Sequence, residues 1–317
     1  MDSSELKNFA QHARFMRESG VALLIASLLL TIFLLIPGPG NQTSNTGSES
    51  QTSISKAPDA FANIPLETKA AVVYDLATGE ILYAKNASAQ LPLASLTKLL
   101  TVYAALAELS QDTPITIPAS IVSVDGPRTF SIGQTFSLSD LARLTLTASL
   151  NDGAAAIAGA TASRENRSES EMLAGAAAAL NLSQTYAVNG SGLDVNNVIS
   201  GGYGSALDLA RLAGALVELA PAIAAATTQS SSQAVSAGGT PFKVVNTDPI
   251  VGTIPHLLLS KTGYTDLAGG NLVLVFDAGM RHPIAAVVLG SSLKARFTDG
   301  TALVAATFAH FAGVASL

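Results

Sequence analysis

The chain has 317 residues, of which 48% are hydrophobic and 13% are charged, so it can bury a large core and most of it is expected to fold. A formal net charge of -6, with only 17 lysine and arginine residues, argues against a protein that binds nucleic acid. The sequence has no cysteine for a thiol nucleophile, and its four histidines lack the spacing of a zinc site, so we expect neither a metal nor a cofactor.

An apolar run near the N-terminus predicts a membrane anchor. Residues 21–36 carry no charge and would form about 24 Å of helix, close to the thickness of a bilayer core. Three basic residues precede the run and none follows before Lys56, so the positive-inside rule places residues 1–20 in the cytoplasm. We therefore predict a single-pass transmembrane signal anchor at residues 21–37, with the remainder of the chain outside the membrane. A cleaved signal peptide is the alternative, although no A-x-A motif directly follows the run.

Residues 38–62 are expected to form a flexible linker. They are rich in Gly, Ser, Thr, Asn, Gln and Pro and have almost no apolar residue before Ile54. A flexible chain of this length spans on the order of 25 to 30 Å, so the folded part would sample a zone above the membrane. Residues 63–317 are then expected to form one folded domain.

The folded part is predicted to begin with a β-hairpin. Two β-prone runs, residues 71–75 and 80–85, flank a turn that contains Gly79. A helix is predicted next in "PLASLTKLLTVYAALAEL", because apolar residues recur there at helical spacing. Ser95 lies near the start of this helix, where free backbone N–H groups and the helix dipole favour an anion. Taken alone, Ser95 is typical of an N-terminal capping residue.

Further helices and then strands are predicted for the rest of the chain. Two helices are expected in "FSLSDLARLTLTASLNDGAAAIAGATA", broken at residues 149–152, with Ser137 or Ser139 capping the first. Two Ala- and Leu-rich helices, three strands and a last helix follow in "SEMLAGAAAALNLS", "SALDLARLAGALVELAPAI", "HLLLSKTGY", "GNLVLVFDAG", "HPIAAVVLGSS" and "TDGTALVAATFAHFAG". Strands at both ends with helices between them predict an α/β (α+β) fold, in which N- and C-terminal strands form one antiparallel sheet with helices packed on it.

A serine followed three residues later by a lysine occurs four times, beginning at Ser4, Ser53, Ser95 and Ser291. On a helix, residues three apart have Cβ atoms about 5 to 6 Å apart, so Ser95 and Lys98 can meet as a nucleophile and its base. Ser4 falls in the cytoplasmic segment, Ser53 in the linker, and Ser291 where a strand gives way to a loop. The context therefore favours Ser95 and Lys98.

Two further motifs follow in order along the chain. Ser-x-Asn at residues 149–151 and Lys-Thr-Gly at residues 261–263 each occur once. With these motifs and the segments "LASLTKLLT", "NGSGLD", "SALDLARL", "VVNT" and "KTGYTDLAGGNLV", the chain resembles the D-alanyl-D-alanine carboxypeptidases among the penicillin-recognising serine enzymes. The similarity runs from about residue 70 to residue 313. It implies a β-lactamase/transpeptidase-like fold, with helices on both faces of the sheet and a helical subdomain.

The chemistry requires a neutral Lys98, because only an uncharged amine can take the proton of the Ser95 hydroxyl. At an ordinary pKa near 10.4, about one lysine in 2,500 is neutral at pH 7, a difference equivalent to about 4.6 kcal/mol. A second cation at Lys261, the helix N-terminus and burial are all expected to lower the pKa of Lys98.

The resemblance also implies how the other motif side chains act. Ser149 would link the two lysines and pass a proton to the leaving amine, and Asn151 would bind the peptide carbonyl of the substrate. Lys261 and Thr262 would hold the free carboxylate of a terminal D-alanine. Taken singly, Lys261 is also consistent with a solvated charge at a strand end, and Ser149 and Asn151 with caps in a helix break.

The backbone around these side chains has implied roles as well. Gly263 would let a strand approach the substrate backbone. The N–H groups of Ser95 and Tyr264 would form an oxyanion hole, and Arg296 would add positive charge nearby. Leu150 stands where relatives most often carry glycine, which puts the shape of that corner of the cleft in question.

The expected activity is that of a serine-type D-Ala-D-Ala carboxypeptidase. It would remove the terminal D-alanine from peptidoglycan stem peptides through a Ser95 acyl-enzyme, at the bacterial cell membrane, and β-lactam antibiotics would inhibit it. A D,D-endopeptidase that cuts cross-links and an inactive wall-binding protein of the same fold stay open as alternatives. A β-lactamase is disfavoured, because no E-x-x-L-N motif lies between Asn151 and Lys261 to supply a deacylating carboxylate.

Overall fold

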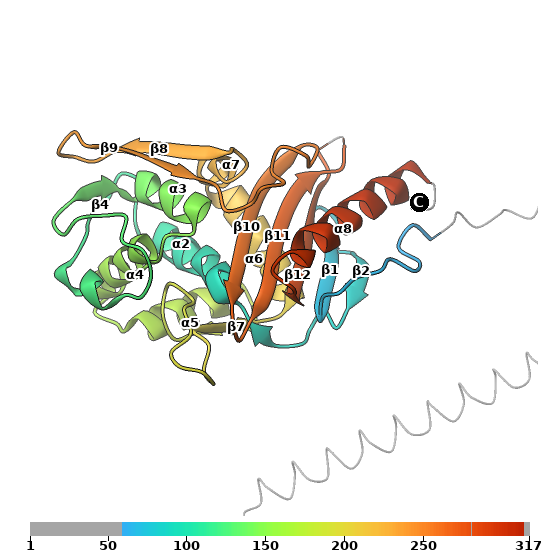
Figure 1. Ribbon diagram of the computed structural model, residues 1–317, viewed down its shortest axis with the longest axis horizontal. Helices are drawn as coiled ribbons and strands as arrows, with labels where there is room; N and C mark the ends of the chain where they lie inside the picture. The colour runs from blue at the N-terminus through green and yellow to red at the C-terminus, as the bar shows by residue number, and fades with distance from the viewer. Residues whose placement is uncertain (1–58, 280, 314–317) are drawn as a thin grey trace, which may run out of the picture. The chain divides into compact units, whose positions relative to one another are not determined.

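A five-stranded antiparallel sheet lies at the centre of the computed structural model, which describes residues 59–279 and 281–313 (Figure 1). Its strand order is β10-β11-β12-β1-β2. The strands are β1 (Ala70–Asp75), β2 (Ile81–Lys85), β10 (Leu257–Thr265), β11 (Gly269–Asp277) and β12 (Pro283–Ser291). The predicted sheet of N- and C-terminal strands is therefore confirmed, since β1 pairs with both β2 and β12.

Both faces of this sheet are buried. Successive residues of β1 alternate between two hydrophobic cores: Ala70 and Val72 belong to one, and Ala71 and Val73 to the other. The same alternation runs along β11 and β12, because neighbouring side chains of a strand point to opposite faces. A strand buried on both faces needs a continuous apolar run, and "LVLVF" in β11 supplies one.

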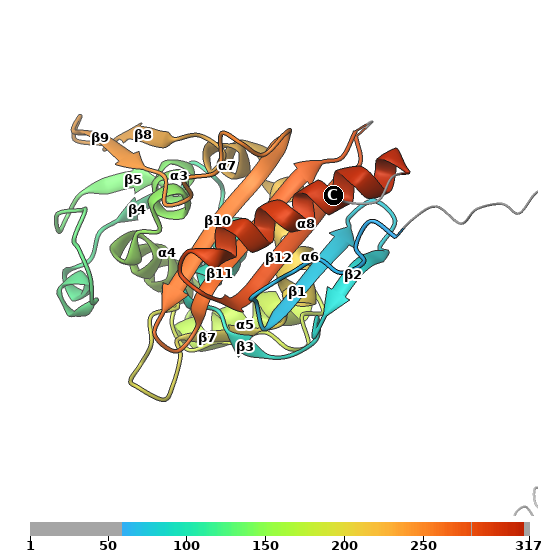
Figure 2. The same cartoon turned by 45° about the vertical axis from the view of Figure 1, so that its right-hand side comes forward.

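Helices cover the two faces unequally. Helix α8 crosses one face of the sheet (Figure 2). Its residues Leu303, Val304 and Ala306 belong to the second core. Helix α6 packs on the opposite face against β12 and β1, and the remaining helices form a subdomain beyond it. The helices are α2 (Thr97–Glu108), α3 (Leu138–Ala148), α4 (Asn151–Glu165), α5 (Glu169–Ala179), α6 (Ala206–Leu219), α7 (Pro221–Ala226) and α8 (Ala295–Ala312).

The ends of the helices follow local side-chain chemistry. The Ser137 hydroxyl accepts a hydrogen bond from the Asp140 backbone N–H and caps α3, so the first of the two predicted capping serines is the correct one. Ser168 and Glu171 form a capping box at the start of α5. The predicted break between α3 and α4 is present and places Ser149 at the end of one helix and Asn151 at the start of the next.

Short elements complete the described chain and were not predicted from the sequence. They are the 3-10 helices η1 (Ala94–Leu96) and η2 (Ala119–Ser123) and the strands β3 (Leu91–Pro92), β4 (Pro114–Thr116), β5 (Thr135–Ser137), β6 (Tyr186–Ala187), β7 (Gly202–Gly204), β8 (Ser231–Val235) and β9 (Pro241–Val245). These strands pair only within small two- and three-stranded sheets. Such brief runs carry too few residues for hydrophobic periodicity to reveal them.

The N-terminal anchor predicted at residues 21–37 lies outside the described residues, as does nearly all of the predicted linker. Among the residues that are described, no helix has the length and apolar character needed to cross a membrane. Ala60 is fully buried and Phe61 belongs to the second core. The packed unit therefore includes residues that the sequence assigned to the end of the linker.

The surroundings of Ser291 do not support a catalytic role. Its hydroxyl donates a hydrogen bond to Asp299 Oδ2 at 2.7 Å, on the side of the sheet that α8 covers. Lys294 is the residue that precedes α8. As the sequence context indicated, this Ser-x-x-Lys pattern does not form a nucleophile and base pair.

Candidate active site

Ser95 lies in η1, the single turn that leads directly into α2. Its side chain is half-buried, and its Oγ lies 2.8 Å from Lys98 Nζ. Within the described chain, neither η1 nor α2 has a side-chain hydrogen bond at its N-terminus. Ser95 is therefore not a helix cap, and its hydroxyl is directed to the lysine as the three-residue spacing predicts.

Lys98 has no exposed surface and has three hydrogen-bonding partners around its amine. Besides Ser95, its Nζ lies 2.9 Å from Asn151 Oδ1 and 2.7 Å from the Ser191 carbonyl oxygen. The last two atoms can only accept hydrogen bonds, whereas a hydroxyl can donate or accept. A neutral amine has two N–H donors and one lone pair, so it can satisfy both acceptors and point its lone pair at the Ser95 hydroxyl.

Burial is the main reason why Lys98 becomes a usable base. Removal from water disfavours the ammonium form and lowers the pKa of Lys98 from 10.5 to about 7, against an opposing effect of the Asp152 carboxylate. Asp152 is itself buried and accepts hydrogen bonds from the Thr129 and Phe130 backbone N–H groups. At neutral pH a large fraction of Lys98 is then uncharged.

Ser149 and Lys261 form a second pair beside the first. Ser149 adopts a left-handed conformation at φ 59° where α3 ends, and its Oγ accepts a hydrogen bond from Lys261 Nζ at 2.9 Å. The expectation that Ser149 links both lysines is only half met, because no hydrogen bond joins Ser149 to Lys98 within the described residues. Asn151 makes the contact with Lys98 instead, and its Nδ2 donates to the Asp125 carbonyl at 3.2 Å.

Position 150, between these two residues, does not require glycine. Leu150 has φ -70° and ψ 123°, an extended conformation that any residue adopts, and its side chain packs against the larger hydrophobic core. The departure from glycine at this position therefore adds no backbone strain at residue 150 itself.

Lys261 is a buried lysine in a crowded positive environment rather than a solvated strand end. Its side chain is 1% exposed, and Nζ also donates to the Thr262 carbonyl at 2.7 Å. Burial lowers the pKa of Lys261 well below its usual value, repulsion from Lys98 and Arg296 lowers it further, and Asp248 opposes the change. Burial is thus the largest cause of the lowered pKa at both lysines, and the repulsion between them disfavours a charge on both at once.

Gly263 brings β10 against the turn that carries the nucleophile. A Cβ added there would lie 2.9 Å from the Leu93 carbonyl oxygen and 3.3 Å from the Ser95 backbone nitrogen. The space that glycine leaves is therefore filled by the protein's own backbone, and the implied approach of this strand to the substrate backbone stays a prediction. Tyr264, the next residue, is about half exposed at the rim, and Arg296 Nη1 donates to the Gly263 carbonyl at 2.6 Å.

Thr262 has a hydroxyl partner that the sequence did not reveal. Its Oγ1 lies 2.6 Å from Thr247 Oγ1, and the Thr247 backbone N–H donates to the Thr147 carbonyl. Thr247 belongs to the "VVNT" segment, which resembles the family in sequence but had no role assigned to it. One of the two hydroxyls can donate a hydrogen bond to an incoming anion, and the other can donate to the oxygen of the first.

The loop that contains "NGSGLD" was also missed as part of the site. Asn189 Oδ1 accepts hydrogen bonds from the Ser191 hydroxyl and from the backbone N–H groups of Ser191 and Gly192. This arrangement fixes the Ser191 carbonyl that meets Lys98. Gly192 has φ 75°, and a Cβ there would lie 2.0 Å from the Ala94 carbonyl oxygen, so only glycine fits beneath the nucleophile turn.

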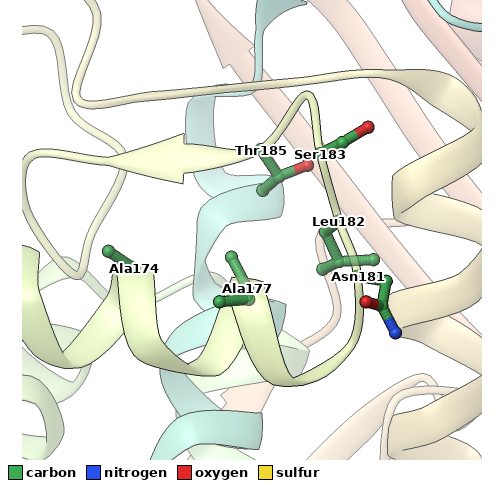
Figure 3. A pocket seen from close by; sticks show the side chains of 7 residues that line it. Ala174, Ala177, Asn181, Leu182, Ser183 and Thr185 are labelled. Carbon is green, nitrogen blue, oxygen red and sulfur yellow. The ribbon is translucent and has the colours of Figure 1, made fainter. Parts of the chain in front are cut away.

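A separate pocket of about 370 Å³ lies beside α5 (Figure 3). Its lining comprises Ala174, Ala177, Ala178, Asn181, Leu182, Ser183 and Thr185. None of these side chains is a strong nucleophile or an ionisable group, and none belongs to the motifs. The pocket therefore has no evident part in the chemistry of Ser95.

Comparisons with known proteins agree with the motifs. A sequence profile described as D-alanyl-D-alanine carboxypeptidase, peptidase family S11, matches residues 54–292. A D-alanyl-D-alanine endopeptidase of Pseudomonas aeruginosa is 31% identical over 264 residues, which cover 80% of this chain and 82% of that protein. The D-alanyl-D-alanine carboxypeptidase DacF of Bacillus subtilis is 26% identical over 294 residues, which cover 91% of this chain and 71% of that protein.

A solved structure gives the same picture of the fold. The crystal structure of penicillin-binding protein D2 from Listeria monocytogenes in its cefotaxime-bound form matches with a TM-score of 0.65 and 28% sequence identity. The match covers 78% of this chain and 99% of that chain. The mixed α/β architecture described above is therefore shared with a penicillin-binding protein.

The lowered pKa of Lys98 is open to direct measurement. In protein labelled with ¹³C at lysine Cε, we expect one resonance, absent from Lys98→Met, to titrate at about pH 7. Asp152→Asn should move this titration to lower pH, because the Asp152 carboxylate favours the ammonium form. A Lys98 resonance that keeps its ammonium shift up to pH 10 would contradict the assignment.

Proposed function

Because the chain belongs to the D-alanyl-D-alanine carboxypeptidase family, we propose that it removes the terminal D-alanine from peptidoglycan stem peptides through an acyl-enzyme on Ser95. The observation that carries this proposal is the 2.8 Å contact between Ser95 Oγ and the fully buried amine of Lys98. It provides a nucleophile and a base of suitable pKa at one point.

Acylation begins when Lys98 Nζ takes the hydroxyl proton of Ser95 and Oγ attacks the carbonyl carbon of the penultimate D-alanine. The backbone N–H groups of Ser95 and Tyr264 stabilise the resulting oxyanion, and Asn151 Nδ2 binds the peptide carbonyl further along the substrate. The C–N bond then breaks, and the proton taken from Ser95 passes from Lys98 to the amine of D-alanine. A route by way of Ser149 requires its hydroxyl, which accepts from Lys261 in the structure, to contact Lys98 once substrate is bound. An ester on Ser95 and a neutral Lys98 remain.

Deacylation uses the same base. Lys98 takes a proton from a water molecule, the hydroxide attacks the ester carbonyl, and Ser95 recovers its proton from Lys98 as the shortened peptide leaves. No side chain beyond the acylation machinery is needed for this half-reaction.

The free carboxylate of the substrate is the feature that directs it to this site. Lys261 Nζ and Thr262 Oγ1 would bind it, with Thr247 supporting the Thr262 hydroxyl at 2.6 Å. Once Lys98 is neutral, its repulsion of Lys261 disappears, so the carboxylate and the uncharged base together favour a proton on Lys261. One cleft can in this way hold a neutral amine and a cation.

An endopeptidase reaction is the second candidate, because the 31% identical relative from Pseudomonas aeruginosa is named a D-alanyl-D-alanine endopeptidase. The bond broken and the acyl-enzyme are the same, but the leaving amine belongs to a neighbouring stem peptide in a cross-link. We further propose that β-lactams acylate Ser95, as the cefotaxime-bound relative indicates for its own site. Because the sequence has no E-x-x-L-N motif after Asn151, the β-lactam acyl-enzyme should hydrolyse slowly.

Labelling by a fluorescent penicillin tests the nucleophile. We expect wild type to be labelled and to release D-alanine from a stem pentapeptide, and Ser95→Ala to lose both, with kcat/KM at least about 10⁴-fold lower. Ser291→Ala is the matched control, because it removes the serine of another Ser-x-x-Lys pattern. Within the described chain, the Ser291 hydroxyl has a hydrogen bond only to Asp299.

Three results would count against parts of this proposal. Labelling that persists in Ser95→Ala would refute the nucleophile. Labelling of wild type without D-alanine release, but with cleavage of cross-linked peptide dimers, would favour the endopeptidase. Labelling with neither reaction would favour the inactive wall-binding protein.

We also propose that residues 21–37 anchor the chain in the bacterial cell membrane, with the catalytic domain outside. The support is the uncharged run of residues 21–36 and the basic residues that precede it. The anchor would hold the active site near the wall, where stem peptides are found.

The absence of cysteine from the sequence allows a clean test of this topology. In intact cells, a membrane-impermeant maleimide should label Ser44→Cys but not Ser4→Cys, which should react only after lysis. Recovery of Ser44→Cys in the soluble fraction as a shortened chain would instead support a cleaved signal peptide.

A further inference from the structure

The backbone just before the nucleophile adopts an unfavourable conformation. Ala94 has φ 50°, in the left-handed region that side chains other than glycine, asparagine and aspartate rarely adopt. Such a conformation persists only where the surrounding structure enforces it. The question is therefore which contacts hold this turn in place.

Asn271, on β11, holds this turn from the side of the sheet. Its side chain is fully buried, and Nδ2 donates to the carbonyl oxygens of Pro92 and Leu93, each at 3.0 Å. Its Oδ1 accepts a hydrogen bond from the Gly290 backbone N–H at 2.8 Å. Both amide N–H groups and the amide oxygen are thus used, and the two carbonyls belong to the peptides that lead into Ala94.

The register of the sheet connects these contacts to the other side of the site. Asn271 lies directly opposite Gly263 on β10. Gly263 touches the same piece of backbone, since a Cβ there would come within 2.9 Å of the Leu93 carbonyl oxygen. The residue after Gly263 is Tyr264, whose backbone N–H is one proposed donor to the oxyanion, and the other donor is on Ser95.

We infer that Asn271 is a positioning residue that fixes the nucleophile turn against strands β10 and β11, and so sets the spacing between the Ser95 and Tyr264 N–H groups. This inference rests on the proposed function, because it concerns the oxyanion of the acylation step. Asn271 does not touch the substrate. It acts through the Pro92 and Leu93 carbonyls, which it holds on the sheet that also carries Tyr264.

A positioning role predicts a particular kinetic signature. Asn271→Asp keeps the size of the side chain and an acceptor for Gly290, but removes both donors to Pro92 and Leu93. The turn should then drift while the carboxylate-binding groups Lys261 and Thr262 stay in place. The first-order rate of Ser95 acylation by a penicillin should fall about 10- to 100-fold, with the pre-acylation dissociation constant changed less than about twofold.

A boronic acid that forms a tetrahedral adduct on Ser95 supplies the decisive readout. Its affinity should fall by the same factor as the acylation rate, because its oxygen occupies the oxyanion position. The matched control is Leu274→Ala, on the same strand but facing the core beneath α8. This variant should unfold at a lower temperature while its acylation rate and boronate affinity match those of wild type.

The outcomes separate this inference from the proposed function. If wild type is not acylated by penicillin, the proposed function fails. If wild type is acylated and Asn271→Asp keeps its acylation rate and boronate affinity, the positioning role is refuted. If Asn271→Asp does not fold, Asn271→Ala removes both donors without adding a charge, and an intact acylation rate and boronate affinity in that variant would refute the role equally.

Discussion

The removal of one amine from water is the constraint on which the site depends. Lys98 is fully buried, and its pKa falls to about 7 because the ammonium form loses its hydration. Two carbonyl-type acceptors, from Ser191 and Asn151, take up the N–H groups of the neutral amine and direct its lone pair to Ser95. Because no part of Lys98 is exposed, these protein atoms take the place of its hydration shell.

The proposed reaction needs a neutral base and a cation close together, and the neighbouring carboxylates bear on both. Asp152 favours a charged Lys98, and Asp248 favours a charged Lys261 and a charged Arg296. Lys98 and Arg296 both repel a charge on Lys261, so a proton on both lysines at once is disfavoured. Loss of the Lys98 proton removes one of these repulsions, and a substrate carboxylate at the proposed site would favour the proton on Lys261.

The sequence predicts those parts of the site that are encoded locally. Helical spacing brings Ser95 to Lys98, and the helix break at residues 149–152 exposes Ser149, because both depend on neighbours along the chain. The missed contacts depend on pairing across long separations: Asn271 meets Leu93 from 178 residues away. A backbone carbonyl such as that of Ser191 also leaves no trace in side-chain patterns, and neither does the close approach of Gly263 to the backbone of Leu93 and Ser95.

The pH dependence of Ser95 acylation tests most directly whether a buried, neutral Lys98 is the base. The rate of acylation by a penicillin, measured in single turnovers between pH 5 and pH 10, should rise about tenfold per pH unit and level off above about pH 7. A rate that continues to rise to pH 10 would show that Lys98 keeps an ordinary pKa. A rate independent of pH would show that another group takes the proton of Ser95.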